Sequence, residues 1–399
     1  MSYTEIKAVK GVRNDVAAER FATGDLLYAK NVDIDETGKI LRRQGSVIQY
    51  PGAAHSAWND KTQAFFVQGG SLHRFVAGGE PTAIAEVAGS RVVFASIDNS
   101  VYWSDGIASG VVKNGVNHKW GIKPPSPIVA SQIGGNLQRG YYLCTMTFVN
   151  GEGIESGAPR STAVNASGIA LTDLEVSDDP TVQAKNIYIS TCNGEIPLLV
   201  ASIPNSQTEL AITEMSQQTE PVGTQFMGPP PAGQVAGYYN GRAYIADGQY
   251  LWYSQAFEFE LFDLRSGYLA LSEDIQTFSA VSDGVFIGTT KKTLFLRGTG
   301  PDDFIQSVVS PVGTILGTEL TVPAEFIGAE DTKGSQVIGT AVLWTSNEGV
   351  VLGMDGGAIR ELTASRFVLP GNIAHGGALL KVRDGIPQYV VSIQTPLSP

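Results

Sequence analysis

The sequence predicts an all-β protein, and three observations lead to this fold class. Short apolar runs alternate with turn-forming residues about every ten positions, glycine is abundant at 46 of 399 residues, and no long stretch has the apolar period of a helix. Hydrophobic residues make up 43% of the chain and charged residues 17%, which is typical of folded globular proteins. We expect more than one hydrophobic core, because single cores stop growing at about 250–300 residues.

The first predicted element is an N-terminal hairpin. An irregular, charged stretch at 11–20 comes first and is expected to form an extended loop. An alternating run at 26–35 and a second run at 39–45 follow, separated by Glu36, Thr37 and Gly38. Two such runs joined by a short glycine-containing loop predict a β-hairpin.

A loosely repeated unit then predicts the main architecture. Each copy has an apolar strand, a short polar turn and a second strand, and the copies lie at 63–75, 91–104, 242–254, 284–298 and 349–362. A single hairpin is only marginally stable in water, but radial repetition buries the faces of successive units jointly. The pattern therefore predicts a β-propeller of five or six blades, with a sandwich of hairpins as the alternative.

Residues 123–224 interrupt this pattern and predict a separate module. Prolines bracket the stretch, at 124–127 where it opens and at 229–231 after it closes, as linkers commonly do. It holds a long strand at 140–149 and shorter strands at 186–190 and 198–201. About a hundred residues with several alternating strands suit a small β-sandwich. The predicted domains are 1–122, the inserted sandwich 123–224, and 225–399 with a C-terminal closing strand.

Composition weighs against several classes of function. The net charge of −12 opposes broad adhesion to nucleic acid, and the short basic groups at 39–43 and 291–292 are expected to be solvated turns. Two cysteines are too few for a disulfide framework. The first residues lack the pattern of a signal peptide, and no apolar run is long enough to span a bilayer. Synthesis in a cytoplasm, with reduced thiols, is the expectation.

No residue pattern predicts a metal, a cofactor or a catalytic nucleophile. The four histidines, His55, His73, His118 and His375, have no paired spacing, so ordinary surface or strand positions are favoured over metal binding. Cys144 and Cys192 are expected on strands of the insert, as buried thiols rather than nucleophiles. No glycine-rich phosphate cradle precedes a helix, so nucleotide binding has no support.

Carboxylates and aromatic residues need more care, because some propellers hydrolyse glycosides with paired acids. Most of the candidate acids stand beside glycine in predicted turns, where Asp is favoured for backbone reasons; they are Asp105, Asp247, Asp283, Glu348 and Asp355. The strand aromatics could stack on sugars, but filling the space between blades is the favoured role; they are Tyr102, Trp103, Trp252, Tyr253 and Trp344.

Several segments resemble one family of virion proteins. The hairpin with 31–34 and 38–45, the stretch 241–246 with 251–254 and 262–263, and the stretch 278–284 with 296–301 are similar to tail nozzle and head-to-tail stabilisation proteins of short-tailed phages. The insert resembles a fibronectin type III-like module at 142–145, 151–156 and 187–190. The chain is short compared with the larger nozzle proteins, which puts additional fibre-docking or plug-forming parts in doubt.

This resemblance implies a structural role without catalysis. The expected assembly is a homo-oligomer of six copies, stacked on the tail adaptor and portal rings to form the distal DNA channel of the virion. Double-stranded DNA would be retained and then pass through without sequence-specific contact, and acidic walls would discourage it from sticking. The alternatives are a tail-fibre adaptor and a carbohydrate- or receptor-binding propeller of the tail.

Three further expectations concern contacts. Arg42, Arg43 and Arg242 are candidate interface residues, forming ion pairs between blades or between subunits. The C-terminal run 388–393 is expected to pair with an N-terminal strand near 26–35 and so close the ring. The segment 301–336 departs from the rhythm of the repeats and is expected to be a loop that reaches a neighbour or the channel.

Overall fold

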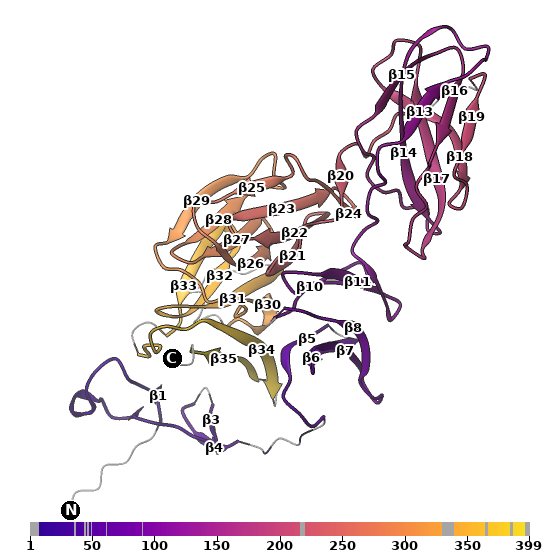
Figure 1. The fold of residues 1–399 in the computed structure, drawn as a ribbon. Coiled ribbons are helices and arrows are strands. Elements are labelled where there is room, and N and C mark those ends of the chain that lie inside the picture. Colours follow the sequence, from indigo (N-terminus) through magenta and orange to yellow (C-terminus); the bar gives the residue numbers. More distant parts are fainter. Residues whose placement is uncertain are drawn as a thin grey trace, which may run out of the picture. The chain divides into compact units, whose positions relative to one another are not determined.

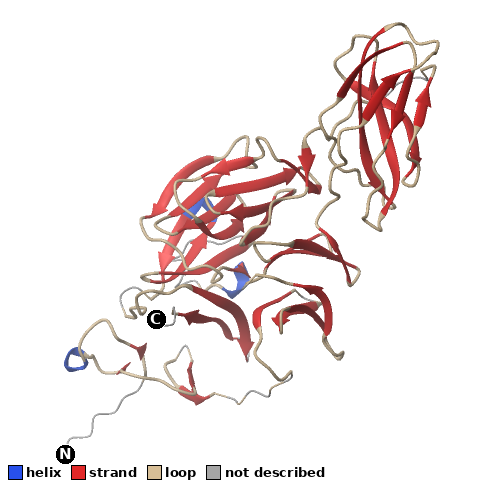
Figure 2. Ribbon diagram, viewed as in Figure 1, coloured by secondary structure: helices blue, strands red, loops and turns tan. Residues whose placement is uncertain are grey.

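The structure is a computed structural model, which describes residues 8–35, 37–43, 45, 48, 50–60, 62–89, 91–215, 220–328, 339–363, 366–383 and 386–395. The described chain is built from strands, and its helices are three single 3-10 turns, η1 (Ala18–Arg20), η2 (Ala324–Phe326) and η3 (Asp355–Gly357) (Figure 2). The prediction of an all-β protein is therefore confirmed.

The chain divides into two compact units. Unit 1 comprises Met1–Val93 and Leu271–Pro399, and unit 2 comprises Phe94–Ala270. Each unit contains antiparallel sheets of four or more strands joined by short connections, which is consistent with the blades of a β-propeller (Figure 1).

Unit 1 holds three four-stranded antiparallel sheets. The first has the order β5-β6-β7-β8, the second β26-β27-β28-β29 and the third β30-β31-β32-β33. Their strands are β5 (His55–Asn59), β6 (Gln63–Gln68), β7 (Ser71–Val76), β8 (Thr82–Glu86), β26 (Ile275–Val281), β27 (Gly284–Thr289), β28 (Thr293–Arg297), β29 (Ile305–Ser310), β30 (Leu320–Pro323), β31 (Thr340–Ser346), β32 (Gly349–Met354) and β33 (Ala358–Glu361).

Aromatic packing joins two of these sheets. The Phe286 ring of β27 lies between the Phe295 ring of β28, 4.8 Å away between centroids, and the Trp344 ring of β31, 5.3 Å away. All three side chains are buried and belong to one core cluster. Large aromatic side chains bury extensive apolar area, so this contact stabilises the packing of the two sheets.

Three small two-stranded sheets complete unit 1. Near the N-terminus, β1 (Gly11–Val12) pairs in parallel with β2 (Asp25–Leu26), and β3 (Val32–Ile34) forms a hairpin with β4 (Ile40–Arg42). Near the C-terminus, β34 (His375–Arg383) pairs with β35 (Ile386–Gln394) over nine residue pairs. The predicted N-terminal hairpin is confirmed, with shorter strands than the sequence pattern indicated.

Unit 2 contains two further antiparallel sheets. One has the order β12-β11-β10-β9, and the other β20-β24-β23-β22-β21 with β25 paired to β23. The strands are β9 (Val93–Ile97), β10 (Ser100–Ser104), β11 (Ser109–Lys113), β12 (Val116–Lys119), β20 (Met227–Gly228), β21 (Val235–Tyr239), β22 (Arg242–Asp247), β23 (Tyr250–Gln255), β24 (Glu258–Asp263) and β25 (Tyr268–Ala270). Trp120 packs between the sheets beside Tyr102 and Phe262, and its indole N–H donates to the carbonyl of Phe259 at 2.8 Å.

Two-residue turns explain why these segments form hairpins. Both turn residues have positive φ at Gly69–Gly70, Asp98–Asn99, Asn114–Gly115 and Asn240–Gly241. That backbone matches a type I′ turn, whose twist agrees with the twist of the flanking strands, and Gly, Asn and Asp tolerate it best. All five hairpins predicted from the sequence are present, as β6–β7, β9–β10, β22–β23, β27–β28 and β32–β33.

The interrupting module of unit 2 is a two-sheet structure. One sheet has the order β13-β16-β19 and the other β15-β14-β17-β18. Its strands are β13 (Val129–Gln132), β14 (Gly140–Asn150), β15 (Thr162–Ala166), β16 (Ile169–Thr172), β17 (Val182–Ser190), β18 (Pro197–Pro204) and β19 (Leu210–Ile212). The two sheets share one apolar core that includes Cys144, Ile169 and Ile187. The hydroxyl of Tyr142 donates back to the carbonyl of Gln138 at 2.6 Å and fixes the start of β14.

Two expectations about segments were wrong. Residues 301–336 do not form one long loop, because Ile305–Ser310 is the outer strand β29 and Leu320–Pro323 is strand β30 of the next sheet; positions 329–338 lie outside the described residues. The C-terminal run 388–393 does not pair with the N-terminal region. It belongs to β35, whose partner is β34, because a local hairpin satisfies its backbone at a smaller entropic cost than a distant strand.

Candidate functional site

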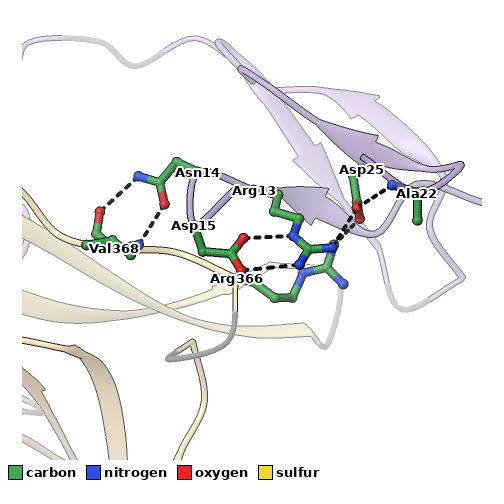
Figure 3. A network of polar contacts seen from close by, with 7 residues as sticks. All are labelled: Arg13, Asn14, Asp15, Ala22, Asp25, Arg366 and Val368. Atoms are coloured by element: carbon green, nitrogen blue, oxygen red, sulfur yellow. Dashed lines mark hydrogen bonds and ion pairs between the residues drawn. The ribbon is translucent and has the colours of Figure 1, made fainter. Parts of the chain in front are cut away.

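The N-terminal segment is tied to residues near 366 by a network of charged side chains (Figure 3). Asp25, at the start of β2, is the centre of this network. Its Oδ2 lies 3.2 Å from Nη1 of Arg13, and its Oδ1 lies 2.6 Å from Nη2 of Arg366. Arg13 also forms a two-pronged contact with Asp15, at 2.7 and 3.2 Å. Two guanidinium groups thus share one carboxylate whose side chain is only 1% exposed.

The charges of this network reinforce one another. Desolvation alone would raise the pKa of Asp25, but the backbone N–H of Ala22 and the guanidinium groups outweigh it, so the pKa is lowered. The hydrogen bond from Arg13 lowers the pKa of Asp15, and the two carboxylates raise the pKa of Arg13. The carboxylates are therefore ionised at neutral pH, and charge-assisted hydrogen bonds of this kind are stronger than neutral ones.

A neutral contact strengthens the same attachment. The Asn14 side chain donates from Nδ2 to the carbonyl of Val368 at 2.8 Å and accepts from the N–H of Val368 at 2.6 Å. The backbone N–H of Asn14 donates to the carbonyl of Arg366 at 3.0 Å. Side chains and local backbone contacts therefore join the N-terminal and C-terminal parts of unit 1, where the sequence predicted strand pairing.

The three arginines predicted as interface candidates lie in two different places. Arg42 is exposed on β4, and Arg43 follows it with Nε 2.9 Å from Oδ1 of Asp33. Arg242, at the start of β22, donates to the carbonyl of Ser254 at 2.6 Å and lies over the ring of Tyr253. Arg43 and Arg242 thus have partners inside their own sheets, whereas Arg42 projects from the N-terminal hairpin. Their role in an interface stays a prediction.

The N-terminal segment also exposes apolar side chains. We call residues 8–43 the N-terminal arm. Its sheets are too small to bury these side chains, and Leu27 and Tyr28 are 67% and 70% exposed. Ile40 and Leu41, on β4, are exposed as well. Exposed large apolar groups that gather on one segment indicate an interaction surface, in contrast to single exposed residues scattered over a protein.

A second charged group lies in unit 2, where the interrupting module meets the β9–β12 sheet. Nζ of Lys113, at the end of β11, lies 2.7 Å from Oε1 of Glu260 on β24 and 3.4 Å from Oε2 of Glu152 in the module. Desolvation lowers the pKa of Lys113, but the hydrogen bond and charge of Glu260 outweigh it, so the pKa is raised. Nearby, Lys119 and Asp178 form an exposed pair at 3.4 Å.

A hollow of about 230 Å³ lies beside this charged group. Its lining combines side chains of β11 and β12 with side chains of the module, among them Lys113, His118, Asn150, Asp179 and Gln183. Most of the lining residues are polar or charged, and they carry both signs of charge. Such a surface can hydrogen-bond a polar ligand, but it lacks the aromatic lining that is common in small-molecule sites.

Three of the five candidate acids, Asp105, Asp283 and Asp355, serve turns, as the sequence predicted. Asp283 and Asp355 stabilise each other's turns: Oδ1 of Asp283 accepts from the N–H of Gly356 at 2.9 Å, and Oδ1 of Asp355 accepts from the N–H of Ser282 at 3.1 Å. Asp105 accepts from the backbone N–H groups of its own turn at 2.6 and 2.8 Å. These acids are engaged by backbone groups, which explains their position beside glycine.

The aromatic and sulfur-containing residues are mostly structural. Tyr102 and Trp344 are buried in cores shared by two sheets, as predicted for them, and Trp103 is buried as well. Trp252 and Tyr253 are half-buried. Cys144 is buried on β14, and burial raises its pKa to about 12. The prediction that Cys192 is a buried strand residue was wrong. It lies in the turn after β17 and is half-buried, because the strand ends at Ser190. Within the described residues no cluster of His, Cys, Asp or Glu could hold a metal, and no helix could cross a membrane.

Sequence reasoning missed the most connected charged residues. Arg13 and Arg366 lie in irregular segments, Asp25 begins the two-residue strand β2, and Lys113 and Glu260 are far apart in the chain. The only available signal was a charged residue inside an otherwise apolar strand, as at Glu260 in Phe259–Phe262, where burial requires a partner.

The chain has no recognised family and only distant structural neighbours. No protein-family model matches the chain, and no curated protein matches it. Among solved structures, BBS1N in its complex with ARL6DN is 11% identical over 86% of this chain and 92% of that chain, with a TM-score of 0.31. Sqt1 of Saccharomyces cerevisiae is 10% identical over 75% and 93%, with a TM-score of 0.22. Neighbours of this kind are β-propeller proteins, but with such low TM-scores the fold assignment rests on the sheets themselves.

Proposed function

We propose that this chain is a structural virion protein, the tail nozzle of a short-tailed phage. In this proposal the blade-like sheets close a propeller of five or six blades, and the interrupting module is a fibronectin type III-like sandwich. The sequence resemblance supports this proposal. So does the occurrence of a two-sheet module, β13–β19, between two blade-like sheets of unit 2, in the segment where the resemblance implies it.

The N-terminal arm is the observation that carries the assembly role. Its small sheets leave Leu27, Tyr28, Ile40 and Leu41 exposed, while the network around Asp25 holds its base. A segment that is anchored to the fold by charged contacts and exposes apolar groups beside the anchor is suited to contact another subunit. We propose a ring of six copies that contacts the tail adaptor on the portal side.

Charge is in keeping with a DNA channel. The net charge of −12 makes the protein repel the phosphate backbone on average, so DNA could move past it without being held. The candidate acids Asp105, Asp283 and Asp355 are engaged in turns, which favours a structural role over glycoside hydrolysis. In this proposal the protein retains packaged DNA and lets it pass at ejection.

Electron microscopy of phage particles tests the nozzle proposal. The particles would carry a small tag in an exposed turn of the protein, such as the turn at Gly151–Gly153, and be labelled with a tag-specific gold conjugate. We expect label at the axial tip of the tail. Label on peripheral fibres would instead support the tail-fibre adaptor, and unlabelled particles that contain no copy of the protein would refute both roles.

A receptor-binding role is the second candidate, and the hollow beside Lys113 is the observation that favours it. Its polar lining, with His118, Asn150 and Gln183, offers hydrogen-bond partners for sugar hydroxyls. A glycan array probed with the full chain would test this role. Binding that is lost in Gln183→Ala would support it, and absence of binding to host surface glycans would exclude it.

A further inference from the structure

The C-terminal hairpin has an open edge that carries no charged residue. The blade-like sheets of the described chain have at least four strands each, whereas the hairpin has only β34 and β35. Both strands are nine residues long, and β35 (Ile386–Gln394) contains no charged residue. Edge strands present unpaired backbone groups, and natural proteins usually protect them with charges, prolines or short length. Pro387, near the start of β35, is the one such feature on this strand.

The two edges of the hairpin differ. The β34 edge carries Lys381, and the N–H of Gly376 on that strand donates to the carbonyl of Leu316 at 2.8 Å. Two outer strands of other sheets carry charges as well, Glu86 on β8 and Lys119 on β12. No other strand of the described chain pairs with β35. The β35 edge is therefore the less protected one.

One face of the hairpin is anchored and the other is uncovered. Leu380 and Tyr389 form a cross-strand pair that packs against the core of the β30–β33 sheet. The Tyr389 hydroxyl donates to the carbonyl of Thr318 at 2.6 Å. On the opposite face, Leu379 and Val390 form a cross-strand pair in which both side chains are exposed, at 51% and 37%. The hairpin is thus a fixed platform with an apolar face and an open edge.

The N-terminal arm supplies a matching element. Its β3–β4 hairpin has three residue pairs and exposes Ile40 and Leu41. A two-stranded hairpin of this size is marginal alone and gains stability when it joins a larger sheet. Added beside β35, it would give the hairpin the four strands that the blade-like sheets have, and it would extend the apolar face of Leu379 and Val390.

Charge favours the arm as the part of one copy that approaches another. The first fifty residues contain eight Lys or Arg and seven Asp or Glu, whereas residues 51–399 contain 19 and 32. Residues 51–399 have an excess of acidic side chains, so these parts of two copies repel each other. The first fifty residues have nearly balanced charge, so the arm is not repelled in this way. Within one chain β3–β4 and β34–β35 remain separate sheets, so the described fold does not use its own arm to fill the edge.

We propose that the β3–β4 hairpin of one copy adds to the β35 edge of a second copy and forms a four-stranded sheet between chains. The contact is a β-strand addition, in which backbone hydrogen bonds supply affinity and alternate side chains supply specificity. The proposal rests on the assembly of copies put forward under the proposed function, and it names the surfaces that meet. Repeated from copy to copy, this head-to-tail contact can close a ring.

The first test places a charge on the edge of the full chain. Val390→Lys is expected to weaken self-association at least about tenfold, measured by sedimentation over a range of concentrations, because a lysine on an exposed edge opposes strand addition. Val390→Thr keeps the β-branched shape and should associate like the unchanged chain. Val308→Lys is the matched control, since Val308 is exposed on β29, an uncharged outer strand whose sheet already has four strands. Far-ultraviolet circular dichroism and thermal melting confirm that each variant is folded.

The second test identifies the contact between chains. Two differently tagged copies, both carrying Cys192→Ser, are co-expressed, one with Leu41→Cys and the other with Val390→Cys, and are treated with a short bismaleimide. A cross-linked product that carries both tags supports the proposal. An assembly that forms without this cross-link and tolerates Val390→Lys overturns it but leaves the nozzle role standing. A chain that stays monomeric at every concentration overturns both the contact and the proposed ring.

Discussion

The two lysines of the β11–β12 hairpin offer a sharp test of how burial decides the value of an ion pair. Lys113 pairs with Glu260 at 2.7 Å, and their side chains are 21% and 11% exposed. Lys119 pairs with Asp178 at 3.4 Å, with exposures of 57% and 91%. The same change, Lys to Met, keeps most of the apolar stem and removes the charge in both cases.

We expect Lys113→Met to lower the free energy of unfolding by about 2 kcal/mol. Removing one partner of a fully buried pair costs roughly 3–5 kcal/mol, because it leaves the other charge buried without compensation. Lys113 is partly solvated, so its effect should lie below that range. Lys119→Met should cost about 0.5 kcal/mol or less, since exposed pairs contribute roughly 0–1 kcal/mol.

Urea unfolding of the full chain provides the measurement, with hydrogen exchange of the β11 and β12 amides to localise the loss. In Lys113→Met a second change, Glu260→Gln, removes the uncompensated carboxylate and should restore about half of the lost stability. Equal losses for the two lysine variants would refute the reasoning, as would a double variant no more stable than Lys113→Met.

Three further predictions concern unit 1. The folded-state pKa of Asp25 is lowered, so its contribution to folding stability is present at neutral pH and is lost as the pH falls below the unfolded pKa of about 4. Limited proteolysis at such low pH should then cleave the N-terminal arm. Arg366→Ala should move the onset of this cleavage to higher pH. Phe286→Ala should lower the free energy of unfolding in urea by about 3–5 kcal/mol, and Phe286→Leu by about 1–1.5 kcal/mol. The reason is that the Phe286 ring fills a core shared by two sheets. Tyr389→Phe should cost about 1–2 kcal/mol, because the carbonyl of Thr318 loses its donor, and ultraviolet titration of the folded protein should place the Tyr389 pKa near its raised value of about 12.

Local signals explain what the sequence could predict. The β9–β10 hairpin follows from an alternating strand, with Val93, Ala95 and Ile97 facing inward, and from Asp98 and Asn99, which tolerate positive φ. Both signals lie within a few residues of each other, so no knowledge of distant contacts is needed. The long strand β14 and its module were predictable for the same reason.

Contacts between distant segments could not be predicted in this way. The strand at 388–393 has the composition of a strand, but composition does not specify which strand is its partner, and the chain supplied β34 instead of the N-terminal run. The network around Asp25 likewise depends on Arg366, which lies beyond every repeat. The candidate acids were predictable because Asp beside Gly has a local backbone function.

The connections of the β13–β19 module have a consequence for how this architecture can change. The chain leaves the β9–β12 sheet at Gly121 and returns near Pro229, and a Cβ placed on Gly121 would lie 3.4 Å from Pro229. Gly228 and Pro124 are similarly close. A segment whose two ends nearly touch can be shortened, exchanged or lost without moving the strands on either side. Related chains can therefore carry different modules, or none, at this position while the sheets of unit 2 keep the same pairing.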